Sequence, residues 1–180
     1  ASGKRSGKTA IGVTISKIIK DNGFDPVVVC MGRGGPENPE LVKGDEIVLS
    51  PEKLMNITEQ GGHAASDYIE DALLGRVTTI GCRRCGGGFA GNPFYSNVIQ
   101  GAEMTNTLNN NFVIMEGSGS TLPPVKTDKT ITVIDASQPL WKIFKYLGQY
   151  KVVISDFIII TKCEPPMANE EKIIKIRKGI

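Results

Sequence analysis

The sequence predicts a three-layer α/β domain with a mostly parallel sheet. Three observations support this prediction. Strand-length apolar runs alternate with helix-length amphipathic segments, the runs are rich in β-branched residues, and a glycine-rich loop precedes the first helix. Strands that are apolar on both faces need helices on both sides of the sheet, and this is the usual arrangement of parallel sheets.

The individual elements follow from the spacing of apolar residues. The first helix is expected over residues 9–21, where isoleucines recur at helical spacing and Gly23 provides a C-terminal stop. Residues 26–31 form a continuous apolar run that is typical of a buried strand. The same patterns predict further strands at 46–49, 77–80, 112–115, 131–134 and 157–160, and helices at 64–74, 96–108, 140–147 and from 169 onward. Residues 117–129 form one long loop, of a kind that is commonly functional.

The overall composition argues against several classes of protein. The chain has 180 residues, enough for one domain, and 21 Lys and Arg against 19 Asp and Glu leave a net charge of only +2. This balance gives no reason to expect nucleic acid or an anionic membrane as a partner. The apolar runs are too short to cross a membrane, no signal peptide opens the chain, and four scattered cysteines do not form a disulfide framework. We therefore expect a cytoplasmic protein.

The strongest motif is the glycine- and lysine-rich loop that leads into the first helix. It consists of Gly3, Lys4, Arg5, Ser6, Gly7, Lys8 and Thr9. In a phosphate-binding loop (P-loop), backbone N–H groups surround the phosphates, the lysine neutralises them, and the closing hydroxyl binds Mg²⁺. Ser2 stands where the first glycine usually lies, and the alternative is a turn with a chance Gly-Lys-Thr. We favour a nucleotide-binding loop for ATP, because the helix follows in register.

The position of this loop also bears on domain organisation. The chain begins only two residues before Gly3, so the strand that normally precedes such a loop is missing. We expect residues 1–180 to be a P-loop NTPase-like nucleotide-binding and catalytic domain, and a fragment of a longer protein.

Two acidic residues at predicted strand ends are candidate Mg²⁺ ligands. Glu116 follows the strand at 112–115, and Asp135 follows the strand at 131–134. Ligands bind at the carboxyl ends of parallel strands, where carboxylates can hold Mg²⁺ directly or through water. The plainer interpretation is a strand-capping residue before a turn. We predict Thr9, Glu116 and Asp135 as the metal site.

Two arginine–glycine loops also follow predicted strands, at 26–31 and 77–80. Their candidate binding residues are Arg33, Gly34, Gly35, Arg83, Arg84 and Gly86. Guanidinium donors and exposed backbone N–H groups suit the capture of phosphate or carboxylate. Solvated flexible loops are the alternative. Two such loops at the same sheet edge favour an anionic second substrate beside the terminal phosphate of ATP.

Three further features carry weaker signals. Cys82 and Cys85 form a Cys-x-x-Cys pair, but zinc needs two more ligands, and a dithiol role stays open because the arginines between them would lower a thiol pKa. His63, the only histidine, is open to a proton-shuttle or phosphate-contact role, with a surface loop as the plainer interpretation. Residues 161–164 are similar to the guanine-reading element of GTPases, but Glu replaces Asp, which indicates a base pocket without guanine specificity.

Together these segments resemble the cyclic 2,3-diphosphoglycerate synthetases. The likeness is carried by residues 31–36, 65–72, 81–88, 116–119, 133–136 and 161–165. The resemblance implies ring closure of 2,3-diphosphoglycerate with ATP and Mg²⁺, giving ADP, phosphate and cyclic 2,3-diphosphoglycerate, a protective solute of methanogenic archaea. It also implies a fold related to dethiobiotin synthetase. Lys8, Glu116, Arg83 and Arg84 would then be the catalytic residues.

Three alternatives stay open at this point. The chain is another P-loop ligase or kinase for a small anion, a non-enzymatic nucleotide switch, or a fragment that is inactive alone. The expected partner is a small molecule, and the sequence does not decide whether the protein is a homo-oligomer.

Overall fold

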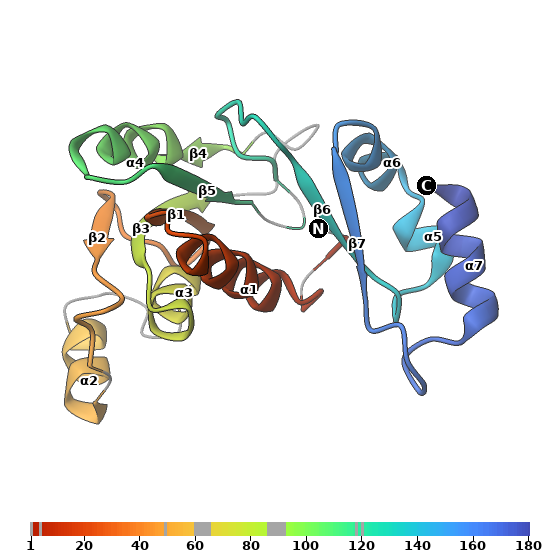
Figure 1. The fold of residues 1–180 in the computed structure, drawn as a ribbon, viewed down its shortest axis with the longest axis horizontal. Helices are drawn as coiled ribbons and strands as arrows, with labels where there is room; N and C mark the ends of the chain where they lie inside the picture. Colours follow the sequence, from red (N-terminus) through yellow and green to blue (C-terminus); the bar gives the residue numbers. More distant parts are fainter. Residues whose placement is uncertain are drawn as a thin grey trace. The chain divides into compact units, whose positions relative to one another are not determined.

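The computed structural model describes residues 2–3, 5–48, 50–59, 66–85, 93–117, 119 and 121–180. The chain divides into two units, each with its own sheet and core (Figure 1). Unit 1 comprises Ala1–Lys8, Ser118–Ser120 and Thr127–Ile180, and unit 2 comprises Thr9–Gly117 and Thr121–Lys126. No helix in the described part of the chain is long and apolar enough to cross a membrane.

Unit 2 is built on a mixed, mostly parallel sheet with the strand order β2-β3-β1-β5. Its strands are β1 (Pro26–Gly32), β2 (Glu40–Val42), β3 (Thr78–Cys85), β4 (Tyr95–Ser96) and β5 (Phe112–Glu116). β1 pairs in parallel with both β3 and β5, whereas β2 and β4 pair antiparallel with β3. Every residue of β1 is buried, as the continuous apolar run predicted. The α/β class with a mostly parallel sheet is therefore confirmed.

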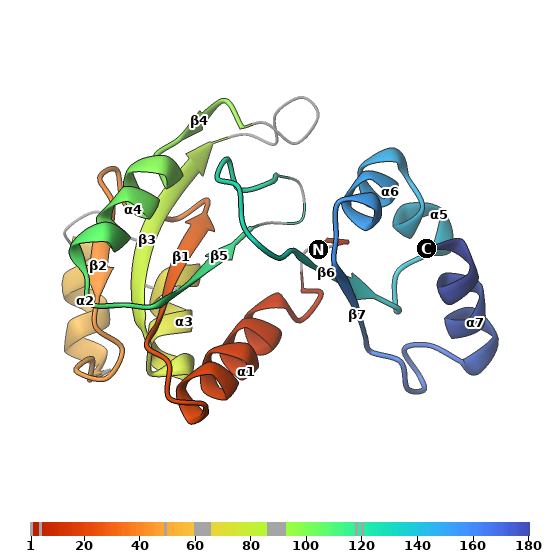
Figure 2. The same ribbon diagram turned by 45° about the horizontal axis from the view of Figure 1, so that its top comes forward.

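Helices cover both faces of this sheet (Figure 2). They are α1 (Lys8–Asp21), α2 (Pro51–Glu59), α3 (Asp67–Gly75), α4 (Val98–Met104) and the 3₁₀ turn η1 (Thr105–Thr107). Val28 and Cys30 of β1 pack toward α3, where Tyr68 and Ile69 lie. Their neighbours along the strand, such as Val29, pack on the opposite face against α4. Alternate β1 side chains thus enter two separate cores.

Unit 1 contains a parallel strand pair and three helices. The pair is β6 (Ile131–Asp135) and β7 (Phe157–Thr161), with Asp135 opposite Thr161. The helices are α5 (Leu140–Ile143), α6 (Tyr146–Val153) and α7 (Glu170–Gly179). Their core contains Ile134, Ala136, Ile143, Ala168 and Ile176. The carboxyl ends of β6 and β7 therefore lie side by side.

The structure corrects some of the predicted boundaries. Residues 46–48 are not a strand, because the N–H groups of Glu46 and Ile47 bond to the Lys43 carbonyl and close a turn. The edge strand β2 lies a few residues earlier. The helix predicted at 140–147 is two helices, since Lys145 is extended and starts α6. Helix α2 and strand β4 were not predicted: α2 is a nine-residue helix with no buried residue, and β4 has only two residues.

Lys151 of α6 is a buried amine and gives a pH-dependent stability prediction. Its side chain is 3% exposed, its Nζ donates to the carbonyl of Gly119, and burial lowers its pKa to about 8. The unfolded chain keeps this proton up to about pH 10.5, so between these two values the unfolded state binds more protons. The free energy of unfolding should therefore rise with pH across this window, by up to about 3 kcal/mol.

Urea unfolding at pH 8 and at pH 10 checks this prediction. The rise in stability between the two should be larger in the parent protein than in Lys151→Met, which has no proton to lose at this position. An equal rise in both proteins would show that Lys151 is not the group responsible.

Candidate functional site

Two side chains at the end of β7 donate hydrogen bonds to the phosphate loop of unit 1. Thr161 Oγ1 donates to the Ser6 carbonyl at 2.8 Å, and Lys162 Nζ donates to the Arg5 carbonyl at 2.6 Å. Gly7 has a positive φ of 87°, which glycine adopts without strain. A loop that binds phosphate must keep its N–H groups for the anion, so anchoring it through carbonyls suits that purpose. Residues 161 and 162, interpreted from sequence as a base pocket, here support the loop.

Asp135 completes this support. Its carboxylate is 3% exposed and accepts from Lys162 Nζ at 2.8 Å and from the Ser137 hydroxyl at 2.6 Å. Burial alone would raise the pKa of Asp135, but the hydrogen bonds from Lys162 and Ser137 outweigh it and hold this pKa below its ordinary value. The Asp135 N–H donates to Ser2 Oγ at 2.9 Å. Asp135 therefore ties the start of the loop to β6, and its role as a metal ligand stays a prediction.

Removing the Lys162 amine should weaken this support. In Lys162→Met the Asp135 carboxylate loses its cation while it stays buried, which should lower the free energy of unfolding by about 2–4 kcal/mol at pH 7. The loss should shrink as the pH falls below 3.8, because the lowered pKa of Asp135 contributes stability only while the carboxylate is charged. Urea unfolding against Lys178→Met, an exposed lysine of α7, measures both effects. Equal stability of the two variants at pH 7 would contradict the prediction.

Two polar groups beside the loop lack a partner within the described residues. The Ser6 hydroxyl is buried, with the residue 1% exposed, and Oε1 of Gln138 is also buried. The Gln138 amide lies against Gly3, where an added Cβ would come within 2.5 Å of it. Buried polar groups are nearly always hydrogen-bonded, so both point to a polar ligand or water at the loop. Sequence reasoning missed Gln138.

Glu116 ends β5 in unit 2 and meets two other side chains. It stands opposite Cys30 in the parallel register of β1 and β5. Cys30 Sγ donates to Asp71 Oδ2 at 2.9 Å and contacts Glu116 Oε2 at 3.6 Å. Burial raises the pKa of the Cys30 thiol well above its usual value, and the two carboxylates raise it further. Among the described residues, these three form the one group of acidic, thiol or imidazole side chains that is close enough to share a metal ion.

Helix α1 closes one side of this group. A cavity of about 10 Å³ is lined by Gly12, Val13 and Ser16 of α1 and by Asp71 and Glu116. Thr9 stands in the first turn of the same helix. Unit 2 thus carries the predicted metal ligands Thr9 and Glu116, together with a second carboxylate that the sequence analysis did not single out.

The first arginine–glycine loop packs closely on β3. Gly35 is buried so near the Cys82 carbonyl that an added Cβ would lie 2.1 Å from that oxygen, so only glycine fits. Arg83 Nε donates to the Gly35 carbonyl at 2.6 Å. Asn97 holds the same loop through the carbonyls of Pro36 and Glu37. Arg83 therefore stabilises the loop that contains Gly35, and its predicted contact with a substrate stays a prediction.

Arg84 is the buried arginine of this edge, and like Arg83 it lies within β3 rather than in the loop predicted after residue 80. It is 5% exposed, and both burial and the neighbouring Arg33 lower its pKa, against the effect of Asp67. Two guanidinium groups at close range repel each other, and an anion between them would relieve that repulsion. This pair is consistent with the predicted anion site.

The two cysteines of the Cys-x-x-Cys pair lie in different environments. Cys82 is buried and Cys85 is exposed, and the two are not disulfide-bonded. Burial raises the pKa of Cys82 to about 12, which opposes the expectation that flanking arginines would lower it. Within the described residues, neither cysteine belongs to a group that could hold a metal.

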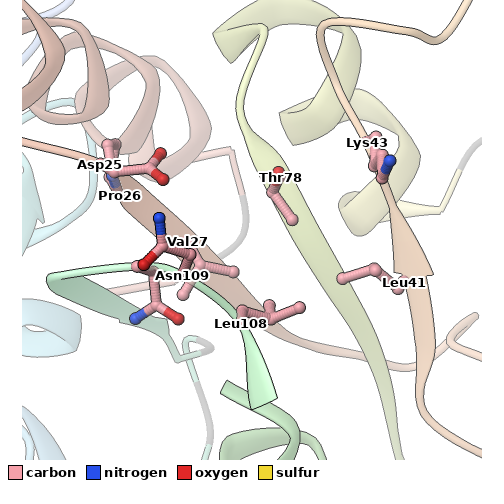
Figure 3. A pocket seen from close by; sticks show the side chains of 9 residues that line it. Asp25, Pro26, Val27, Leu41, Lys43, Thr78, Leu108 and Asn109 are labelled. Carbon is pink, nitrogen blue, oxygen red and sulfur yellow. The ribbon is translucent and has the colours of Figure 1, made fainter. Parts of the chain in front are cut away.

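The larger cavity of unit 2 lies at the opposite end of the strands. It measures about 140 Å³, and Figure 3 shows its lining by Pro26, Val27, Thr78, Leu41 and Leu108. Pro26 and Thr78 are the first residues of β1 and β3, whereas Glu116 and Arg84 lie at or near the carboxyl ends of their strands. In parallel sheets ligands bind at the carboxyl ends, so this cavity is not the candidate site.

The predicted site residues divide between the two units. Unit 1 holds Gly3, Arg5, Ser6, Gly7, Lys8 and Asp135. Unit 2 holds Thr9, Arg33, Gly34, Gly35, Arg83, Arg84 and Glu116. Lys4, His63 and Gly86 lie outside the described residues.

Comparison with known proteins gives one consistent result. Residues 1–180 match the family described as cyclic 2,3-diphosphoglycerate synthetase, P-loop domain. The cyclic 2,3-diphosphoglycerate synthetase of Methanothermus fervidus is 49% identical over 178 residues, which are 99% of this chain and 39% of that protein. The same-named proteins of Methanosphaera stadtmanae and Rubrobacter xylanophilus are 50% and 44% identical, over 95% and 98% of this chain. The chain spans only 37% and 41% of their lengths.

Proposed function

Because this chain belongs to the family of cyclic 2,3-diphosphoglycerate synthetase P-loop domains, we propose that it provides the nucleotide-binding part of an ATP-dependent ligase. The proposed reaction converts 2,3-diphosphoglycerate and ATP into cyclic 2,3-diphosphoglycerate, ADP and phosphate. The observation that carries this proposal is the match of the whole chain to the family, together with close identity to relatives of that name. The relatives are much longer, so the complete activity is assigned to the whole protein.

The phosphate loop is the proposed site for ATP. Its carbonyls are tied to Thr161 and Lys162, and the buried Ser6 hydroxyl lacks a partner within the described residues, as expected where a phosphate oxygen binds. Lys8 would neutralise the phosphates. Mg²⁺ fits the oxygen donors of unit 2, since the carboxylates of Glu116 and Asp71 are hard ligands. The hydroxyl of Thr9, in the first turn of α1, is the further ligand that the sequence predicts.

Arg84 and Arg33 are the proposed site for the second anion. A dianionic phosphate between two guanidinium groups forms charge-assisted, bidentate hydrogen bonds, and it relieves the repulsion that lowers the pKa of Arg84. Arg83 donates a hydrogen bond to the Gly35 carbonyl and would fix the conformation of that loop next to the anion.

The proposed chemistry joins two phosphates of one molecule. The γ-phosphoryl group of ATP is transferred to an oxygen of one substrate phosphate, which breaks the bond to ADP. An oxygen of the neighbouring phosphate then attacks the inner phosphorus of the new anhydride, and inorganic phosphate leaves. Both steps crowd negative charges, so the protein contributes mainly positioning and cationic stabilisation.

Phosphorus NMR tests the reaction directly. The full-length protein that contains this chain is incubated with ATP, Mg²⁺ and 2,3-diphosphoglycerate, and we expect a new cyclic pyrophosphate signal together with ADP and phosphate. ADP without the cyclic product would support a kinase or another ligase. Slow ATP hydrolysis that ignores 2,3-diphosphoglycerate would support a nucleotide switch. Either result would overturn the proposed reaction.

A further inference from the structure

The contact between Cys30, Asp71 and Glu116 joins three separate elements of unit 2. Cys30 lies in β1, Asp71 in α3 and Glu116 at the end of β5. Cys30 is 1% exposed and Asp71 is 4% exposed. The parallel register places Cys30 and Glu116 on adjacent strands, and the thiol faces α3 rather than α4. The arrangement is therefore fixed by the sheet and not by a mobile loop.

We propose that Cys30 is a positioning residue, whose thiol sets the orientation of the metal-binding carboxylate of Glu116 by linking it to Asp71. The proposal rests on the proposed function, in which Glu116 binds Mg²⁺. The thiol itself is a poor Mg²⁺ ligand, because Mg²⁺ prefers oxygen, so Cys30 acts through its neighbours.

The distances explain how the thiol works. Its single S–H group is within hydrogen-bond distance of both carboxylates, at 2.9 Å from Asp71 Oδ2 and 3.6 Å from Glu116 Oε2, so it donates mainly to Asp71 and weakly to Glu116. A contact to Oε2 restricts rotation of the Glu116 carboxylate and so sets where its other oxygen lies. Groups that orient a metal ligand commonly change metal affinity about 10- to 100-fold when they are removed. Cysteine suits this position because its side chain is small and apolar enough for the core and its S–H group can still donate a hydrogen bond.

A matched pair of variants separates positioning from packing. Cys82 is also a buried cysteine at 1% exposure, but it lies on β3 in the opposite core, where its sulfur packs near Gly101 of α4. Cys30→Ala and Cys82→Ala remove the same atoms from neighbouring strands, and only the first removes a contact to carboxylates. Cys30→Ser restores a donor at the same place.

Two readouts are needed, one of them independent of catalysis. Electron paramagnetic resonance measures binding of Mn²⁺ in the presence of ADP, and a Mg²⁺ titration of ADP formation separates the metal requirement from kcat. For Cys30→Ala we expect about 10-fold weaker Mn²⁺ binding and an equal rise in the half-saturating Mg²⁺ concentration, with kcat at saturating Mg²⁺ within about threefold. Cys30→Ser should lie near the parent, and Cys82→Ala should not change metal affinity.

The outcomes also separate this inference from the proposed function. Metal affinity in Cys30→Ala equal to that in Cys82→Ala would overturn the positioning role, and so would a Cys30→Ser variant as weak as Cys30→Ala. If Cys30→Ala does not fold, Cys30→Val fills the space without a donor and takes its place. Glu116→Gln is measured in parallel. If it leaves Mn²⁺ binding unchanged, the assignment of Glu116 to the metal fails; if it weakens binding while Cys30→Ala does not, only this inference fails.

Discussion

Lys8→Ala is expected to lower the rate of ATP-dependent product formation by about 100- to 1000-fold, the usual loss when a charged group that stabilises a phosphoryl-transfer transition state is removed. Lys8 is the first residue of α1 and belongs to the phosphate loop, and an anion is favoured at a helix N-terminus. The anchors of the loop, Thr161 and Lys162, bond to the carbonyls of Ser6 and Arg5. The variant should therefore keep its fold and lose most of its catalysis.

Steady-state kinetics with saturating 2,3-diphosphoglycerate measure this loss, and calorimetry measures the accompanying fall in ATP affinity. Lys17→Ala is the matched control, because Lys17 is an exposed lysine farther along the same helix. Urea unfolding of both variants checks that each is folded under the assay conditions. A rate in Lys8→Ala within threefold of Lys17→Ala would mean that the loop does not bind the reacting phosphates.

Features encoded in short segments could be predicted from the sequence. The phosphate loop is formed by residues that are adjacent in the chain. Its glycines and lysine can therefore be recognised in the sequence without knowledge of any tertiary contact. The buried strand β1 is likewise visible as one apolar run, and its parallel neighbours follow from the alternation of strands and helices. Glu116 was predicted as a metal ligand because strand ends carry ligands in this class of fold, and the structure places it at the end of β5.

Features that depend on distant pairs could not be predicted. Cys30 and Asp71 are 41 positions apart, and Asp71 looked like one of several acidic residues on an amphipathic helix. Asp135 and Lys162 form an ion pair although they are 27 positions apart in the sequence. The position of Asp135 at a strand end did not predict this partner. The break between α5 and α6 is local and results from the extended backbone of Lys145. It could not be predicted, because no glycine or proline stands at this position.

Arg84→Met should raise the KM for 2,3-diphosphoglycerate by about 10- to 100-fold, because a charge-assisted hydrogen bond to an anion contributes about 1.5–3 kcal/mol. Arg84 is 5% exposed, and its pKa is lowered first by burial and then by the charge of Arg33, so an anion would be favoured beside it. Urea unfolding identifies any loss of stability in the variant, and the KM of the folded variant reports substrate binding.

The matched control is Arg177→Met, which removes an exposed arginine of α7, and the KM for ATP serves as an internal reference. Arg84→Lys should recover only part of the affinity, since an ammonium keeps the charge but not the two parallel donors of a guanidinium. A KM for 2,3-diphosphoglycerate in Arg84→Met that equals the control would place the second anion elsewhere. A rise in the KM for ATP alone would assign Arg84 to the nucleotide instead, and the second anion would then need a different site.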